Sequence, residues 1–290
     1  MVVLDMNVEG GAEKLYIDGN LHRQLLKYVK PAVQKKDFDY VICVDGGEGE
    51  GKSVFSFQLA KILDPNFSLN NVAFTPDEFE DKILTAKKYS CIVYDECHTG
   101  LSGRSSLSEA NKKLVSLMME MRSLSLYCIL VLPTYYMLDR YCVLHRCKGL
   151  FHAYLKDGKR GYWVFYNRDR MKKLYLQGKK TYDYNSVRYL FFGRFLDQYM
   201  LNEKDYRARK KKVFREKRRF SNADTYKTQR DIILRMIHEL YEGNIKRIVN
   251  LCGERGYIVD RTTISKIVHT KKTQINENVN SNPNIDVFKG

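Results

Sequence analysis

The sequence lacks both a long apolar run and a paired cysteine motif. A membrane-spanning helix needs about 20 consecutive apolar residues, and the apolar segments here are much shorter. No charged stretch followed by an apolar one opens the chain, so nothing predicts a secretory signal. The seven cysteines form no CxxC pair and no regular framework, which argues against a disulfide scaffold. These absences predict a reduced, cytoplasmic protein without an integral membrane segment.

Acidic residues are also in deficit. The 290 residues include 50 Lys and Arg against 34 Asp and Glu, a formal net charge of +16. Such an excess favours a polyanionic partner such as nucleic acid or acidic membrane, although a merely basic soluble protein would also carry it. The length suits one large domain plus a small one, since domains usually span about 100–200 residues.

A glycine-rich loop lies between an expected strand and an expected helix. Residues 40–44 (YVICV) predict a short buried parallel strand, and residues 52–63 have helical periodicity. The segment between them matches GxxxxGK[ST] without a mismatch; it comprises Gly46, Gly47, Glu48, Gly49, Glu50, Gly51, Lys52 and Ser53, followed by Val54. Such a loop surrounds phosphates with backbone N–H groups at the positive end of a helix. We therefore predict a P-loop that binds ATP, with Lys52 on the β- and γ-phosphates and Ser53 on Mg²⁺.

Two acidic residues follow the next apolar strand. Residues 91–94 (CIVY) are followed directly by Asp95 and Glu96. Alone, two acids could simply end a strand. Downstream of a P-loop, we expect Asp95 to hold Mg²⁺ through its water shell and Glu96 to polarise the attacking water as general base. The pair favours hydrolysis to ADP and phosphate over a kinase reaction.

The P-loop and the Asp-Glu pair together resemble the additional-strand catalytic-glutamate division of P-loop ATPases, which includes the AAA+, RecA and FtsK/HerA groups. The resemblance implies an extra strand between the P-loop strand and the Asp strand, a place that residues 126–132 can fill. It also implies a polar residue that senses the γ-phosphate at the end of that strand, and Thr134 matches. An equal alternative is that Thr134 caps a helix over residues 135–144.

The stretch from Asp95 to Tyr154 further resembles zonula-occludens-toxin-like and FtsK/HerA-like ATPases of phages, viruses and other mobile elements. It has the acidic pair, a polar loop over 99–106, a helix over 108–124, and then a strand with Thr134 after it. Members of that group pump DNA or support phage assembly and export. The resemblance implies a homo-oligomeric ring in the host cytoplasm, with a possible viral or mobile-element protein partner.

Ring ATPases commonly complete each site with an arginine from the neighbouring subunit, which stabilises charge on the transferring phosphoryl group. Arg122 and Arg146 are favoured here because they lie near strand ends; the other candidates are Arg104 and Arg140. Each could instead be an ordinary surface or salt-bridging arginine.

Positive charge is concentrated near the C-terminal third of the chain. Residues 203–220 contain ten basic and three acidic side chains, interrupted by aromatic and apolar residues. This pattern favours a basic helix or arm that binds the phosphate backbone of DNA over a solvated linker. The expected contacts are Lys210, Lys211, Lys212, Arg218 and Arg219.

Residues 228–269 have the periodicity of a helix-turn-helix module, with helices over 229–242 and 245–255 and a third helix that Asp260 caps. In that third helix Ile264 and Ile267 should face inward. The outward side chains, expected to meet phosphates and base edges, are Arg261, Thr262, Ser265 and Lys266. A plain three-helix packing module would show the same pattern.

These elements predict an α/β fold, a P-loop NTPase with a mainly parallel sheet flanked by helices. Residues 150–155 and 161–166 should form an edge β-hairpin, and the C-terminal module should be all-α. The expected division is a P-loop ATPase domain over 1–201, a basic linker over 202–227, a helix-turn-helix module over 228–272 and a flexible tail over 273–290.

The leading functional hypothesis is an ATPase that acts on DNA, most specifically a viral or mobile-element DNA-translocating or packaging ATPase. The chain shows no second cluster of acids for a nuclease, which argues against a complete two-domain terminase. Three alternatives stay open: a replication initiator or helicase loader, a DNA-binding regulator switched by nucleotide, and a phage assembly or export ATPase.

Overall fold

The computed structural model describes residues 2–6, 13–97, 101, 109–219, 222–256 and 259–269. The chain divides into two compact units, Met1–Val213 and Phe214–Gly290, and the boundary falls within helix α7 (Glu203–Arg219). The expected polar loop with Arg104, apart from Leu101, and the expected tail over 273–290 lie outside the described residues.

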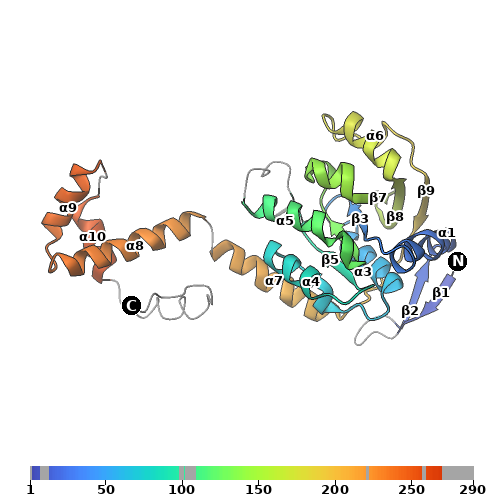
Figure 1. The fold of residues 1–290 in the computed structure, drawn as a ribbon, viewed down its shortest axis with the longest axis horizontal. Coiled ribbons are helices and arrows are strands. Elements are labelled where there is room, and N and C mark those ends of the chain that lie inside the picture. The colour runs from blue at the N-terminus through green and yellow to red at the C-terminus, as the bar shows by residue number, and fades with distance from the viewer. Residues whose placement is uncertain are drawn as a thin grey trace. The chain divides into compact units, whose positions relative to one another are not determined.

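A seven-stranded sheet forms the centre of the first unit, in the order β4-β5-β6-β3-β7-β8-β9 (Figure 1). The five strands from β4 to β7 in that order run parallel, β8 pairs antiparallel with β7, and β9 pairs antiparallel with β8. This confirms the predicted mainly parallel sheet, with the β7–β8 hairpin near one side and β9 as the outermost strand. The strands are β3 Tyr40–Asp45, β4 Val72–Ala73, β5 Cys91–Tyr94, β6 Tyr127–Val131, β7 Cys147–Lys156, β8 Lys159–Asn167 and β9 Phe191–Arg194.

Strand β6 lies between β3 and β5 and pairs with both in parallel. This confirms the extra strand expected between the P-loop strand and the Asp strand. Because the three strands run in the same direction, their carboxyl ends meet at one edge of the sheet. The loops after β3 and β6 meet there, since the Gly46 N–H donates to the Pro133 carbonyl at 3.3 Å. After β5, the Asp95 N–H donates to the Ala73 carbonyl at the end of the neighbouring strand β4, at 2.9 Å.

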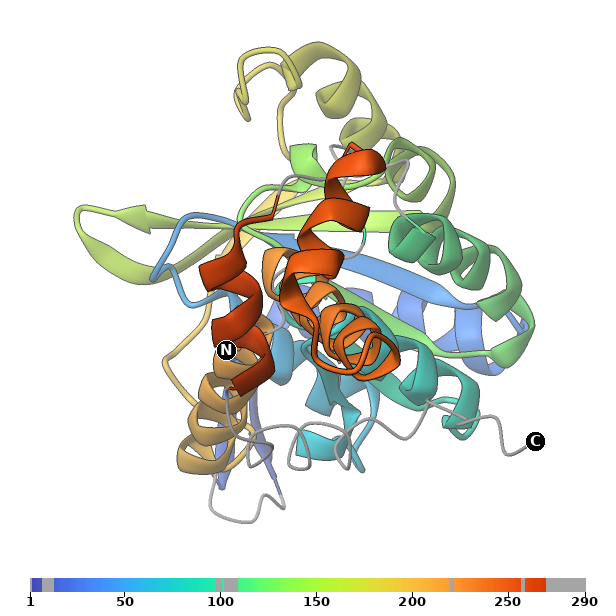
Figure 2. The same ribbon diagram turned by 90° about the vertical axis from the view of Figure 1, so that its left-hand side faces the viewer.

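Helices cover both faces of this sheet (Figures 1 and 2). Side chains alternate along β3, because successive residues of a strand point to opposite faces: Ile42 and Val44 belong to one buried cluster, and Val41 and Cys43 to the other. The helical segments are α1 Gly19–Gln24, η1 Leu25–Val29, α2 Lys30–Gln34, α3 Lys52–Leu63, η2 Leu69–Asn71, α4 Pro76–Thr85, α5 Glu109–Glu120, η5 Met121–Leu124, η6 Tyr135–Met137, η7 Cys142–Arg146 and α6 Arg168–Gly178.

The single helix predicted over 135–144 is wrong. Thr134 caps the short turn η6, and Leu138 then adopts an extended conformation that ends it. The Asp139 side chain accepts the N–H of Tyr141 at 2.8 Å and starts a new helical segment, which continues as η7. Two competing side-chain caps within six residues of chain therefore divide the segment.

An antiparallel ribbon of β1 (Val2–Asp5) and β2 (Lys14–Ile17) was not anticipated from the sequence. All seven cysteines are free thiols, six of them buried. In the part of the chain that the structure describes, no helix combines the length and the apolar character needed to cross a bilayer.

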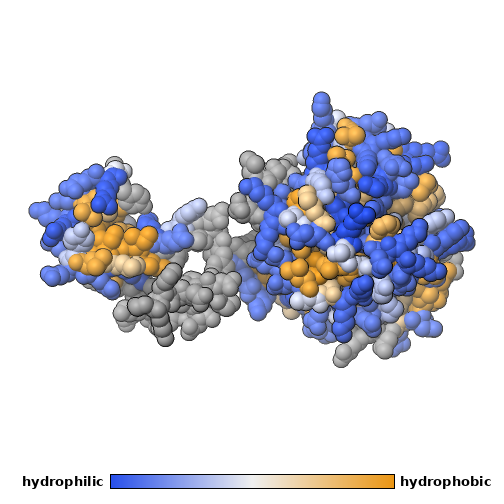
Figure 3. All heavy atoms as spheres, in the orientation of Figure 1, coloured by the Kyte–Doolittle hydropathy of each residue, from blue (hydrophilic) through white to orange (hydrophobic). Residues whose placement is uncertain are grey.

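The second unit contains three described helices, α8 (Asn222–Leu240), α9 (Ile245–Glu254) and α10 (Arg261–His269). They pack around Leu234, Ile248, Ile264 and Ile267, which confirms the inward orientation of the two α10 isoleucines. Asp260 accepts the N–H of Thr263 at 2.8 Å and caps α10 as predicted. Apolar surface is visible over this unit in Figure 3, and α8 exposes Ile232, Ile233, Met236 and Leu240.

Candidate nucleotide site

The loop between β3 and α3 requires glycine at both of its ends. Gly46 has φ +147° and Gly51 has φ +86°, a region that L side chains rarely adopt. A Cβ at Gly46 would lie 2.4 Å from the carbonyl oxygen of Ala153, and one at Gly51 would lie 2.9 Å from the Phe195 ring. The neighbouring strand and ring thus press directly against the loop, and α3 begins at Lys52 as the motif predicted.

Two groups expected to face phosphate are engaged within the loop. The Gly47 N–H donates to the Glu50 carboxylate, and the Lys52 ammonium donates to the Gly47 carbonyl. Burial lowers the pKa of Lys52, while Glu50, Glu96 and other nearby acids oppose that shift. A phosphate that enters the loop must therefore displace the Glu50 carboxylate from the Gly47 N–H.

Ser53 and Asp95 come together as expected of a magnesium site. The Ser53 hydroxyl lies 3.3 Å from Oδ1 of Asp95, and Asp95 is only 1% exposed. Hydroxyl and carboxylate oxygens suit Mg²⁺, which usually completes its shell with waters and substrate phosphates. Among the described residues no group of three or more His, Cys, Asp or Glu side chains could hold a metal. Ser53 and Asp95 would hold the ion, which would supply neutralisation of phosphate charge when bound.

Glu96 follows Asp95 in a turn and has φ +61°. A non-glycine residue in this region costs on the order of 1–3 kcal/mol, and such residues cluster at functional sites. The strained turn keeps the Glu96 side chain beside that of Asp95, and both approach the ammonium of Lys210.

Helix α7 adds two side chains to this acidic pair. The Tyr206 hydroxyl donates to Oδ2 of Asp95 at 2.6 Å. The Lys210 ammonium lies 3.0 Å from the same oxygen and 3.1 Å from Oε1 of Glu96. Burial lowers the pKa of Lys210, but the two carboxylates and Tyr206 outweigh it and raise the pKa above its ordinary value. Lys210, expected on a DNA-binding surface, is therefore found in the nucleotide site.

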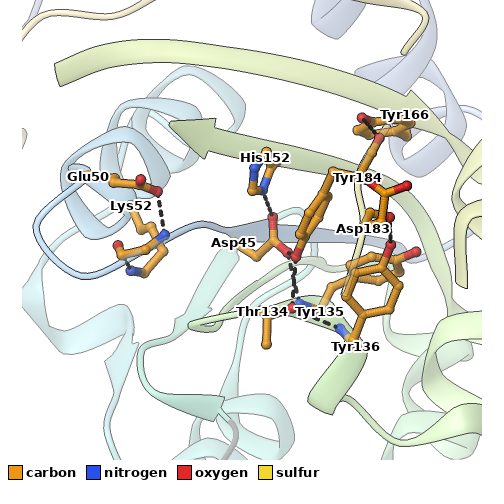
Figure 4. Close-up of polar contacts among 11 residues, drawn as sticks. Asp45, Glu50, Lys52, Thr134, Tyr135, Tyr136, His152, Tyr166, Asp183 and Tyr184 are labelled. Carbon is orange, nitrogen blue, oxygen red and sulfur yellow. Dashed lines mark hydrogen bonds and ion pairs between the residues drawn. The ribbon is translucent and has the colours of Figure 1, made fainter. Parts of the chain in front are cut away.

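Asp45, the last residue of β3, organises the other side of the P-loop. Its buried carboxylate accepts the Tyr135 N–H at 2.8 Å and the Tyr184 hydroxyl, and it lies 2.9 Å from Nδ1 of His152. Figure 4 shows the His152 and Tyr184 side chains directed toward it. The sequence signal was available: Asp45 is a charged residue that continues a buried run immediately before the glycine loop.

Thr134 belongs to the same network. Its hydroxyl lies 2.8 Å from that of Tyr184, which reaches Asp45, and it accepts the Tyr136 N–H at 3.4 Å (Figure 4). Thr134 therefore does act as a cap, but of the short turn η6 and not of the predicted helix over 135–144. Its role as a γ-phosphate sensor stays a prediction, made from a position at the same sheet edge as the P-loop.

The arginines favoured as fingers lie at the opposite edge of the sheet. Arg146 pairs with Asp39, which precedes β3, and the two side chains are only 8% and 3% exposed. A guanidinium buried in an ion pair is not presented to a neighbouring subunit, so the structure contradicts that role for Arg146. Arg122 is exposed and lies over the Phe38 ring, with 5.6 Å between guanidinium and ring centre. Arg140 is exposed too.

Sequence reasoning missed an arginine beside the P-loop. Arg160 lies at the start of β8, and its guanidinium is close to Gly49. A Cβ atom added to that glycine would be 3.5 Å from Nη2 of Arg160. The hairpin turn between β7 and β8 places Arg160 beside the loop. Its side chain is exposed, whereas that of Arg146 is buried. A hairpin was predicted, but its contact with the glycine loop depends on the β3–β7 pairing.

Most of the expected DNA contacts are exposed. Lys211 and Lys212 on α7 point to solvent, whereas the side chains of Arg218 and Arg219 lie outside what the structure describes. On α10 the exposed members of the predicted set are Arg261, Thr262 and Lys266, and Ser265 is half-buried. Their role in DNA binding stays a prediction.

A phosphate loop between β3 and α3, with β6 inserted beside β3, is the architecture of a P-loop NTPase of the additional-strand type. No protein-family model and no curated protein sequence matches the chain. Among solved structures, the N-terminal domain of zonular occludens toxin from Neisseria meningitidis is 11% identical over 55% of this chain and 94% of that chain, with a TM-score of 0.36.

The genome packaging NTPase B204 from Sulfolobus turreted icosahedral virus 2 is also similar. In complex with sulfate it is 16% identical over 57% of this chain and 92% of that chain, with a TM-score of 0.28. In complex with AMPPCP the identity is 10% over 50% and 85%, with a TM-score of 0.25. Because these identities and scores are low, the likeness concerns the fold alone.

Proposed function

We propose that this protein hydrolyses ATP and couples the hydrolysis to action on DNA, as a DNA-translocating or packaging ATPase of a virus or mobile element. The observation that carries the proposal is the approach of Ser53 to Asp95, 3.3 Å between hydroxyl and carboxylate, with Glu96 as the next residue. Lys52 binds the phosphates, Ser53 and Asp95 hold the metal, and Glu96 accepts the proton of the attacking water. Arg160 contributes positive charge at the loop.

Coupling to DNA is supported by where the charge lies. Lys211 and Lys212 on α7 and Arg261 and Lys266 on α10 are exposed. Exposed lysines and arginines bind the phosphate backbone whatever the base sequence, because they release condensed counterions. A motor that moves along DNA needs binding of that sequence-independent kind.

The experiment is steady-state ATP hydrolysis by the full chain, with and without double-stranded DNA. Wild-type protein should hydrolyse ATP faster when DNA is added. Lys52→Ala should lose nucleotide binding, and Glu96→Gln should keep binding but lose hydrolysis. Glu120→Gln, an exposed acid on α5, is the matched control and should behave as wild type. An ATP hydrolysis rate of the wild-type protein that is the same with and without DNA would contradict the proposed coupling to DNA.

A further inference from the structure

The contact of α7 with the acidic pair has a consequence for metal binding. The Ser53 hydroxyl lies 3.3 Å from Oδ1 and 3.5 Å from Oδ2 of Asp95, and Oδ2 also accepts from both Tyr206 and Lys210. The Lys210 ammonium thus lies against the carboxylate that the proposed function assigns to Mg²⁺. A divalent cation and an ammonium on the same carboxylate repel each other strongly at such distances.

We propose that Lys210 is an internal cation of the nucleotide site, which neutralises Asp95 and Glu96 and is displaced when the magnesium-bound nucleotide enters. This inference rests on the proposed ATPase function and names how its site is controlled. While Lys210 is in place, Oε1 of Glu96 is paired with its ammonium at 3.1 Å. Displacement of Lys210 by the metal-bound nucleotide would therefore also remove this contact from Glu96.

Tyr206 provides the fixed point for this exchange. It is 4% exposed, with its ring 5.0 Å from that of Phe57 and 5.8 Å from that of Phe74. Arg209 holds the same turn of α7 against the first unit, because its guanidinium donates to the Glu78 carboxylate and to the Leu69 carbonyl, each at 3.1 Å.

Lys210 differs from these anchors because its charge is carried on a flexible four-carbon chain and remains 24% exposed. The ammonium can withdraw to solvent while the Tyr206 ring stays packed. The same helix continues along the chain into the residues after Val213.

The test compares Lys210→Met, which keeps the apolar chain but removes the charge, with Lys204→Met at an exposed position on the same helix. The readout is binding of a fluorescent, non-hydrolysable ATP analogue at increasing Mg²⁺ concentration. Lys210→Met should reach half-saturation at about tenfold lower Mg²⁺ than wild type, the size expected when one close like charge is removed. Lys204→Met should match wild type.

An unchanged Mg²⁺ requirement in Lys210→Met, with normal analogue binding, would overturn this inference and leave the ATPase proposal standing. If the wild-type protein binds no analogue at any Mg²⁺ concentration, both this inference and the ATPase proposal are contradicted. Neither outcome requires a measurement of hydrolysis.

A separate observation points to a second binding site, at the edge of the sheet opposite the P-loop. A cavity of about 370 Å³ there is lined by Phe38, Asp39, Arg122, His145, Arg146, Lys148 and Arg168. Four of these side chains are Lys or Arg, and one is an acid, which is already paired with Arg146. These positive charges act on Lys148. Burial and the charges of Arg168, Arg146 and Arg122 lower its pKa, and the charge of Asp39 partly offsets this shift.

Two of these arginines also carry an unsatisfied donor. Nε of Arg146 and Nε of Arg168 are buried and have no hydrogen-bond partner among the described residues. Arg168 is the first residue of α6, so the positive end of that helix adds to the field. From the four basic side chains that line it and the helix end beside it, we infer that the cavity binds a phosphate group, from a nucleic-acid backbone or from a small phosphorylated ligand.

This site is tested in the Lys52→Ala background, in which the P-loop no longer binds phosphate. Inorganic phosphate should raise the melting temperature of that protein. Addition of Lys148→Ala and Arg168→Gln should abolish the rise, whereas Lys173→Gln, an exposed position on α6, should preserve it. An equal rise in all variants would overturn the inference. If duplex DNA competes with phosphate, the ligand is a nucleic-acid backbone; if it does not, the ligand is a small phosphorylated molecule.

Discussion

Glu50 competes with phosphate inside its own loop. Its carboxylate accepts the Gly47 N–H, a donor that a P-loop directs at the nucleotide, and it adds a negative charge where phosphates bind. Glu50→Ala should therefore bind ATP roughly five- to tenfold more tightly, the equivalent of one hydrogen bond of ordinary strength. The affinity can be measured with a fluorescent nucleotide, with Glu48→Ala on the exposed part of the same loop as control. Equal or weaker binding by Glu50→Ala would show that the carboxylate does not compete.

The buried ion pair of Arg146 predicts a role in stability and not the role of an arginine finger that its sequence position suggested. Its removal leaves Asp39 buried without a partner, and breaking a buried ion pair on one side costs about 3–5 kcal/mol. Arg146→Ala should lower the free energy of unfolding by that amount in urea denaturation. Arg140→Ala, at an exposed position, should change it little. A stable Arg146→Ala protein that had lost only its hydrolysis would instead restore the finger hypothesis.

At the scale of elements, the sequence predicted those parts whose signal is local. Helix α3 begins and ends where its periodicity and the glycine loop require, and β5 occupies the expected apolar run. The β1–β2 ribbon, α6 and β9 escaped notice because their residues are mixed in polarity and are stabilised by neighbours distant in sequence. The Ser53–Asp95 pair was predictable from two motifs.

The contact of Lys210 with Asp95 was not predictable in the same way, because 115 residues separate the two partners. A local sign was nonetheless present. Tyr206 and Val213 are buried at helical spacing, with Lys210 between them on the same face. That spacing would have indicated that one face of the basic segment packs against the protein.

Helix α10 depends on a very small core. Ile264 is fully buried, together with Leu234, Ile248 and Ile267, and a core of this size has little stability to lose. Ile264→Ala should cost about 2–4 kcal/mol and unfold the second unit, visible as lost helical circular dichroism and lost DNA binding. Ile233→Ala on the exposed side of α8 should have little effect. Retention of full helicity by Ile264→Ala would contradict this account of the core.

At the scale of the whole molecule, the net charge of +16 should appear as salt-dependent binding to DNA. If Lys211 and Lys212 each neutralise one phosphate, replacing both by Ala should reduce the slope of log affinity against log salt concentration by about two. Fluorescence anisotropy of a labelled duplex measures this slope. The matched control replaces the exposed pair Lys35 and Lys36 by Ala. An equal reduction of the salt slope in that control would show that DNA binding depends on the overall charge and not on Lys211 and Lys212.

The central claim is that this protein hydrolyses ATP with Glu96 as the general base. The most direct test is single-turnover hydrolysis of ATP already bound to excess protein, comparing wild type with Glu96→Gln. The account predicts that both proteins bind ATP with similar affinity and that Glu96→Gln hydrolyses it about a hundredfold more slowly or worse, the usual contribution of a general base. Equal single-turnover rates in the two proteins would contradict the assignment.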